Sequence, residues 1–171
     1  GKVEVLEFFW YGCPHCYQLE PELHDWAKKL PKDVTFKRQP AVLNDSWLPL
    51  TRAYFALEAL SVADKLHTAV FRAVHDDHMD LNNPQNFFNW AARQGVDRKK
   101  LSDACNSFGV NAMTARAKQM TAAYKLNGVP ALAVRRPSDG GAIFSKAAAT
   151  ALASGRAGFS RSTKASCIRS A

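Results

Sequence analysis

The chain has 171 residues, enough for one domain with a substantial core or for one domain carrying an inserted subdomain. No apolar run approaches the roughly 18 residues that a membrane-spanning helix needs. The formal net charge is +8, but residues 135–171 hold 7 Lys and Arg against one acid, whereas residues 1–134 hold 16 against 14. The body of the chain is nearly neutral and lacks zinc-finger and RNP motifs, so the composition argues against nucleic-acid binding.

The first expected elements form a strand-helix-strand unit. β-Branched and aromatic residues fill positions 3–10, which is typical of a strand buried in a sheet. Apolar residues then recur at helical spacing from Tyr17 to Leu30, where Pro31 ends the pattern. Residues 34–38 alternate in polarity like a second strand.

A helical period follows from Asp45 and continues for most of the next 65 residues, with Asn83 and Asp97 as helix N-caps. A further helix is expected from about Asn111 to the C-cap signal at Gly128. Its inward residues are predicted to be Met113, Ala117, Met120 and Tyr124.

After Gly128, a short strand is expected at 131–134, and a turn through 137–141 would let residues 142–144 pair back on it. Residues 146–153 predict a weak helix. From 155 onward the composition, rich in Ala, Ser and basic residues, predicts disorder.

The chemistry of the chain is expected at Cys13-Pro14-His15-Cys16, between the first strand and the first helix. Cysteines at i and i+3 share a helix face, and the first of them, at the helix start, faces unpaired N–H groups and the positive end of the helix dipole. Pro14 costs no hydrogen bond at the first helical position. His15 adds a positive charge or a hydrogen-bond donor. We therefore predict a redox pair in which Cys13 is the exchanging thiolate.

The sequence resembles the DsbA family of periplasmic thiol:disulfide interchange proteins. The resemblance covers residues 2–134 and is carried by residues 5–9, the motif at 13–17, the helical insertion and residues 128–131. It implies an α/β, thioredoxin-like fold with an inserted all-helical subdomain. The family has a strand before the one that begins here and a different ending, so we expect a missing N-terminal edge strand and an atypical C-terminal end.

The resemblance also implies roles for three residues outside the cysteine motif. Pro130 would be a cis-proline opposite the disulfide, and the Val129 backbone would pair with an extended substrate. Glu7 would be a buried acid beneath the active site that assists proton transfer. On these grounds the expected site is Cys13, Cys16, His15, Pro14 and Glu7 for catalysis, with Val129 and Pro130 for substrate.

The expected function is donation of the Cys13–Cys16 disulfide to reduced, unfolded secreted proteins in the periplasm. No cofactor other than this disulfide and no metal are expected. By resemblance the partner that restores the disulfide is a membrane-embedded, quinone-linked reoxidase. We expect a monomer that binds no nucleic acid. No secretory leader pattern is present, and Gly1 is expected to open a mature form or a fragment.

Residues 1–44 with 110–154 are expected to form the thioredoxin-like domain, 45–109 the helical insertion and 155–171 a disordered tail. Alternative functions are a reductase or isomerase of the same fold, a metal-binding module using Cys13, His15 and Cys16, and an inactive fragment.

Some residues also have a plainer interpretation. The alternative for Glu7 is a solvent-facing strand residue. The alternative for Pro130 is an ordinary trans proline in a loop. Cys105 is expected in the core beside Leu101 and Phe108. The His- and Asp-rich segment from His67 to His78 is interpreted as an exposed helix end.

Overall fold

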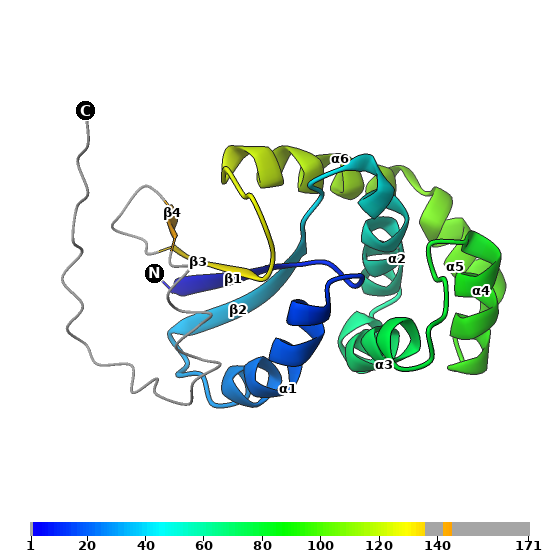
Figure 1. Ribbon diagram of the computed structural model, residues 1–171, viewed down its shortest axis with the longest axis horizontal. Helices are drawn as coiled ribbons and strands as arrows, with labels where there is room; N and C mark the ends of the chain where they lie inside the picture. Colours follow the sequence, from blue (N-terminus) through cyan, green and yellow to red (C-terminus); the bar gives the residue numbers. More distant parts are fainter. Residues whose placement is uncertain (1, 136–141, 145–171) are drawn as a thin grey trace.

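The computed structural model describes residues 2–135 and 142–144, and these form a sheet with helices on both faces (Figure 1). The described strands follow the order β2-β1-β3-β4. β2 is parallel to β1, β3 is antiparallel to β1, and β4 is antiparallel to β3, with Val134 opposite Ile143. All four expected strands are confirmed: β1 (Val3–Phe9), β2 (Val34–Pro40), β3 (Ala131–Arg135) and β4 (Ala142–Phe144).

Side chains of β1 alternate between two hydrophobic layers, as a strand covered on both faces requires. Val5 packs with Leu19 and Leu23 on the side of α1 (Pro14–Ala27). Leu6 and Phe8 face the opposite side, where α6 (Phe108–Ala123) covers the sheet. Glu7 has the parity of Val5 and therefore lies on the α1 side.

Helices α2 (Leu48–Ala59) to α5 (Arg98–Asn106), which follow β2, lie beyond the end of β1 at which the cysteine motif begins (Figure 1). Their capping predictions are confirmed, since the Asn83 side chain accepts from the N–H groups of Gln85 and Asn86, and that of Asp97 from Lys100. The elements between β2 and β3 are a 3₁₀ turn (Asp45–Trp47), α2 (Leu48–Ala59), α3 (Ala63–His75), α4 (Pro84–Arg93), α5 (Arg98–Asn106) and then α6.

Two predicted core positions near α6 are wrong. Phe108 opens the helix and is 88% exposed, while Met113 is 38% exposed. The buried face of α6 is instead Val110, Thr114, Ala117 and Thr121. The two threonine hydroxyls donate to the carbonyls of Val110 and Ala117, which lets polar residues pack as if apolar.

The exposed-helix-end interpretation is also wrong for His67, which is buried at 1% exposure on the inner face of α3. It holds for Asp76, Asp77 and His78, which are exposed.

The expected helix at 146–153 and the tail from 155 lie outside the described residues. The division into a thioredoxin-like domain and a helical insertion stays a prediction. In the part of the chain that the structure describes, no helix is long and apolar enough to cross a membrane.

Candidate active site

Cys13 lies where β1 and its following turn enter α1. It is the N-cap residue, with an extended backbone (φ −89°, ψ 116°), and Pro14 occupies the first turn as expected. The Cys13 N–H donates to the Trp10 carbonyl at 3.0 Å, and the Cys13 carbonyl accepts from Tyr17 N at 3.2 Å. These bonds place the half-buried Cys13 thiol over the start of the helix.

The two thiols of the motif are electrostatically unequal. The pKa of Cys13 is lowered to about 6, first by a hydrogen bond from the Cys16 thiol and then, against partial burial, by the N–H groups of Cys16 and His15 and the charge of His15. The same hydrogen bond, together with burial, raises the pKa of Cys16. At neutral pH, Cys13 is therefore the thiolate and Cys16 the thiol.

Pro14 and His15 are both exposed, so the outer rim of the motif is open to a partner. The His15 imidazole Nδ1 lies 3.4 Å from Gln18 Oε1. His15 acts on Cys13 through its backbone N–H and its charge, which agrees with the expected tuning role.

The loop before β3 meets the cysteine motif from the other side. The Val129–Pro130 peptide bond is cis, which confirms the expectation at Pro130. The Cys13 Sγ lies 3.6 Å from the Val129 carbonyl oxygen, although the two residues are far apart in sequence. The structure thus brings together Cys13 and the two residues expected to contact substrate.

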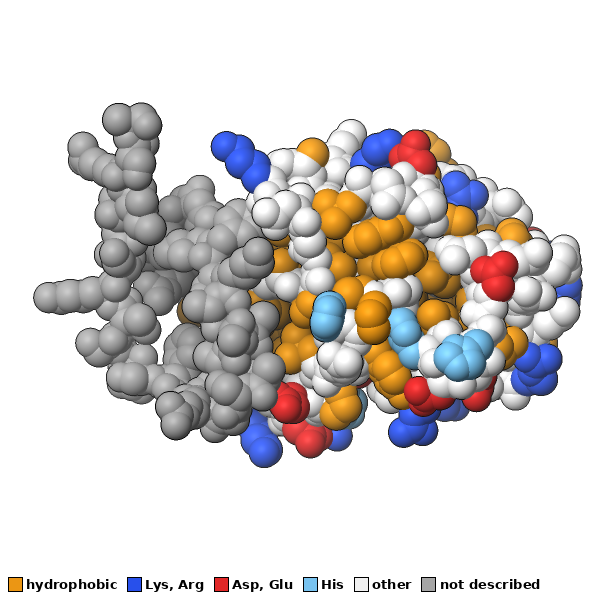
Figure 2. Space-filling view, in the orientation of Figure 1, with side chains coloured by type: hydrophobic (Ala, Val, Ile, Leu, Met, Phe, Trp, Pro, Cys, Tyr) orange, Lys and Arg blue, Asp and Glu red, His pale blue; other side chains and the backbone are white. Residues whose placement is uncertain are grey.

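Aromatic side chains hold the turn between β1 and Cys13. The Trp10 indole stacks on Trp47 at 4.3 Å between centroids and 4° between planes. Gly12 is needed beside this stack, because a Cβ at that position would overlap the Trp10 ring. Figure 2 shows hydrophobic side chains gathered on this face of the molecule, where β1 passes into α1 in Figure 1.

Helix α3 supports the motif from below. Tyr17 stacks on His75 at 5.2 Å and donates to Asp76 Oδ2 at 2.6 Å. The His75 Nε2 lies 2.8 Å from the Tyr11 carbonyl oxygen. The segments that flank the two cysteines are therefore anchored to the same helix.

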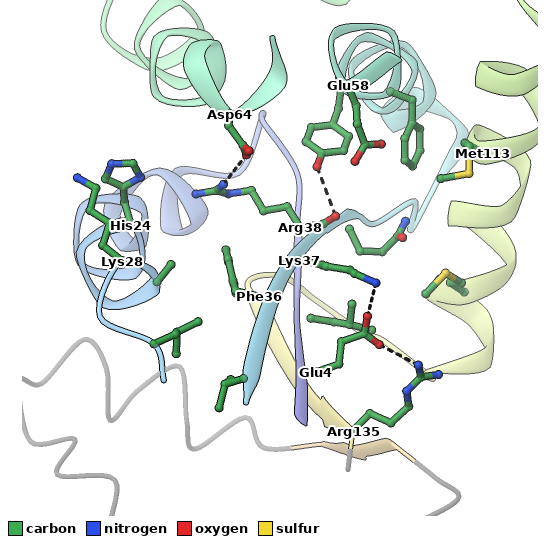
Figure 3. A pocket seen from close by; sticks show the side chains of 18 of the residues that line it. Glu4, His24, Lys28, Phe36, Lys37, Arg38, Glu58, Asp64, Met113 and Arg135 are labelled. Atoms are coloured by element: carbon green, nitrogen blue, oxygen red, sulfur yellow. Dashed lines mark hydrogen bonds and ion pairs between the residues drawn. The ribbon is translucent and has the colours of Figure 1, made fainter. Parts of the chain in front are cut away.

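Beneath Cys16 lies a cluster of buried charged groups, which we call the buried cluster: Glu7, Glu20, Arg38 and His67. Glu7 is 0% exposed and Glu20 1%. The Arg38 guanidinium lies 3.6 Å from Glu7 Oε2 and 3.2 Å from Glu20 Oε1. It also lies 3.3 Å from Oδ1 of Asp64, a surface residue, and Figure 3 shows this last contact.

The charge state of Glu7 is decided by two opposing effects. The 3.6 Å contact with Arg38 favours a carboxylate, whereas complete burial favours the neutral acid. Burial is the larger effect because Arg38 is shared with Glu20 and Asp64, and the pKa of Glu7 is raised to about 8. The burial predicted for Glu7 is confirmed, and its carboxyl group is mainly protonated and neutral at pH 7.

This raised pKa gives the first testable prediction. A carboxyl whose pKa is higher in the folded than in the unfolded protein binds more protons when folded, so its contribution to stability is lost as pH rises from about 4.5 to about 8. Glu7→Gln should therefore flatten the fall in unfolding free energy over this interval, by up to about 1.4 kcal/mol per pH unit. Denaturant unfolding of the reduced protein at several pH values measures this pH dependence of the unfolding free energy. Glu22→Gln, at an exposed position, is the control. Equal slopes in all three proteins would contradict the assignment.

Glu20, Arg38 and His67 were not expected in the site, yet their spacing in the sequence carried a signal. Glu20 follows Cys16 by four residues and precedes Leu23 by three, which places it on the buried stripe of α1. His67 has the same relation to Ala63 and Val70 in α3. A polar residue inside an apolar helical stripe indicates a buried partner.

The buried cluster also contains the one potential metal-ligand group found among the described residues. Single ligand atoms of Glu7, Glu20 and His67 lie within 4.8 Å of one another. The Arg38 guanidinium already supplies the positive charge there, which disfavours a cation. Cys13, His15 and Cys16, the ligands of the metal-binding alternative, do not form such a group among these residues.

Comparison with known proteins agrees with this geometry. A family model described as a DSBA-like thioredoxin domain matches residues 4–154. The thiol:disulfide interchange protein DsbA of Azotobacter vinelandii is 43% identical over 134 residues, covering 78% of this chain and 63% of that protein. The corresponding protein of Burkholderia cepacia is 42% identical over 135 residues, 79% of this chain and 64% of its own length.

Solved structures give the same result in three dimensions. The crystal structure of Pseudomonas aeruginosa DsbA has a TM-score of 0.74 at 41% identity, covering 78% of this chain and 70% of that one. The oxidoreductase DsbA from Xylella fastidiosa has a TM-score of 0.74 at 34% identity, covering 78% and 73%. The chain spans less than two thirds of the length of the curated relatives named above. With a matching family model over most of its residues and a thioredoxin-like sheet that carries the cysteine motif, the chain belongs to the DsbA family of thioredoxin-like proteins.

Proposed function

We propose that the chain is a dithiol oxidase that donates a Cys13–Cys16 disulfide to protein substrates. The observation that carries the proposal is the low pKa of Cys13, about 6, at the start of α1. A stable Cys13 thiolate stabilises the reduced protein, and this makes the corresponding disulfide a stronger oxidant.

The reaction begins when a substrate thiolate attacks the Cys13 sulfur of the disulfide. The Cys13–Cys16 bond breaks, Cys16 leaves as a thiolate and takes up a proton, and a mixed disulfide joins Cys13 to the substrate. A second substrate thiolate then attacks the substrate sulfur, and Cys13 leaves as a thiolate. The low pKa of Cys13 makes it a good leaving group in this last step.

Val129 and Pro130 give the substrate a place beside the attacked sulfur. The 3.6 Å approach of the Val129 carbonyl to Cys13 Sγ supports pairing of an extended peptide with this loop. Pro14 and His15 are the exposed flank of the same site. Glu7, completely buried and raising the pKa of Cys16, is the proposed proton donor to the leaving thiolate.

The similarity to thiol:disulfide interchange proteins supports a proposal for the substrates and partners. Reduced, unfolded secreted proteins would supply the dithiols, and a membrane-embedded, quinone-linked reoxidase would restore the disulfide. We propose the periplasm as the compartment, where disulfides persist, and a monomer as the acting form.

The proposal is tested by two measurements. Ultraviolet thiolate absorbance against pH should give a Cys13 midpoint near 6, and the oxidised protein should convert a dithiol peptide to its disulfide at neutral pH, whereas Cys13→Ala should not. An ordinary midpoint near 8.5 would contradict a strong oxidant and favour a reductase. Equal peptide oxidation by the protein and Cys13→Ala would remove the catalytic role.

A further inference from the structure

His67 is buried inside the site's charged cluster, but the exchange of thiols and disulfides does not require it. It lies on α3 at 1% exposure, with Nδ1 2.9 Å from the Tyr11 hydroxyl and Nε2 3.3 Å from Glu20 Oε2. Glu7, Glu20 and His67 each place a ligand atom within 4.8 Å of the others. A histidine at this position is close enough to both carboxyl groups for its protonation state to depend on theirs.

Buried polar atoms without a hydrogen-bond partner mark groups of the cluster that can gain or lose a proton. Among the described residues, the two carboxyl oxygens of Glu7 have no hydrogen-bond partner, and the His67 Nε2 has its 3.3 Å contact with Glu20 Oε2. Buried polar atoms without a partner are rare in native structures. A proton on either group would have an acceptor or a charge nearby.

The charges of the buried cluster balance in two ways. His67 and Arg38 lower the pKa of Glu20 despite its burial. Glu20 is therefore a carboxylate, and it neutralises the Arg38 guanidinium. Burial lowers the pKa of His67 and raises that of Glu7, so the remaining pair rests as acid and imidazole. Carboxylate and imidazolium is the other arrangement that is neutral overall. One proton placed on either member therefore leaves the net charge of this buried region unchanged, which avoids the cost of an isolated buried charge.

The groups that face this pair come from every element packed around it. Tyr11 and Tyr54, whose pKa values are both raised by burial, stay neutral near physiological pH. The other groups are Cys16, Glu20 and His24 of α1, Arg38 of β2, Glu58 of α2 and Asp64 of α3.

A route to solvent leads through Arg38. Arg38, Tyr54 and Asp64 line a cavity of about 920 Å³, and Figure 3 shows the Arg38 side chain extending to Asp64 across it. The Tyr54 hydroxyl donates to the Arg38 carbonyl at 3.4 Å. The exposed Asp64 and this cavity give the Arg38 side of the cluster contact with solvent.

We propose that Glu7 and His67 share a single proton, and that this proton is the one delivered to Cys16 when the disulfide opens. The inference rests on the proposed function and makes His67 a positioning residue for the proton. When the Cys16 thiolate takes the proton from Glu7, the Cys16 S–H bond forms and Glu7 becomes a carboxylate. His67 then takes up a proton from solvent and balances the new charge.

The sharing is tested by nuclear magnetic resonance on the reduced, otherwise unmodified protein. With ¹³C-labelled glutamate carboxyl groups and ¹⁵N-labelled histidine rings, the Glu7 and His67 signals should change with the same apparent midpoint, because the proton belongs to the pair. Glu7→Gln should lower the His67 midpoint by about one pH unit or more, since a negative neighbour is lost. A His67 ring that stays neutral while Glu7 titrates, with a midpoint unaffected by Glu7→Gln, overturns the proposal.

The delivery to Cys16 is tested by the pH profile of dithiol-peptide oxidation. His67→Gln removes the cation that stabilises the Glu7 carboxylate, so the alkaline limb of the profile should move up by about one pH unit. His78→Asn, an exposed histidine after α3, is the matched control and should leave the profile unchanged. Coincident midpoints with an unshifted limb would overturn the delivery to Cys16. An unmodified protein that oxidises no peptide would remove the proposed function, while the resonance experiment still decides the sharing.

Discussion

Replacing Cys16 with alanine should raise the pKa of Cys13 from about 6 toward the ordinary thiol range, near 8.5. The hydrogen bond from Cys16 is the largest contribution to the stability of the Cys13 thiolate, ahead of the backbone N–H groups and His15. The variant also lacks the disulfide that the proposed reaction donates. Oxidation of a dithiol peptide should therefore fall to the uncatalysed rate.

Ultraviolet thiolate absorbance measures the first effect, and the peptide assay the second. Cys105→Ala is a suitable control, because Cys105 is a buried cysteine of α5 and lies outside the site. It should change neither the Cys13 midpoint nor the oxidation rate. A Cys16→Ala protein that keeps its Cys13 midpoint near 6 would show that the helix start alone stabilises the thiolate.

Arg38→Met should be the most destabilising substitution in the buried cluster. The guanidinium side chain is 9% exposed and lies beside two carboxyl groups whose side chains are each 1% exposed. Removing it deprives the Glu20 carboxylate of the guanidinium charge at 3.2 Å, and loss of one member of a buried ion pair costs about 3–5 kcal/mol. The loss should shrink in acid, once the pH falls through the lowered pKa of Glu20 and its carboxylate is protonated.

Denaturant unfolding at neutral and acidic pH measures this effect. Lys37→Met is the matched control, since Lys37 is the neighbouring strand residue, its side chain is 64% exposed and it pairs with Glu4 at 2.6 Å (Figure 3). An exposed pair of this kind contributes up to about 1 kcal/mol. Similar losses in the two variants would show that Arg38 acts as a surface charge.

The strands, the capped helices and the cysteine motif were predictable because each depends on local chemistry. A β-branched run predicted β1, and side-chain oxygens at Asn83 and Asp97 predicted two helix starts. The short pairing of residues 142–144 with β3 followed from a turn signal between two compatible strands. Cis Pro130 came from the resemblance, since the peptide isomer depends on tertiary contacts.

The buried cluster was only partly predictable, because it joins side chains from β1, α1, β2 and α3. Glu7 was expected from the resemblance. Glu20 and His67 were missed because a polar residue in an apolar helix stripe shows that a partner exists without identifying it. Met113 was wrongly expected to face inward on α6, where Thr114 and Thr121 satisfy their own hydroxyl groups within the helix and pack inward. Ala117 is buried as predicted.

The position of β1 has a consequence for how the chain resists local opening. β1 is paired along both edges, with β2 and β3, and Phe8 and Phe9 at its end are completely buried. Amide hydrogens of such a strand exchange only in the rarest openings of a protein. The backbone amides expected to exchange most slowly, those of β1, therefore end a few residues before Cys13. Repeated thiol-disulfide exchange at Cys13 can proceed without local unfolding of β1.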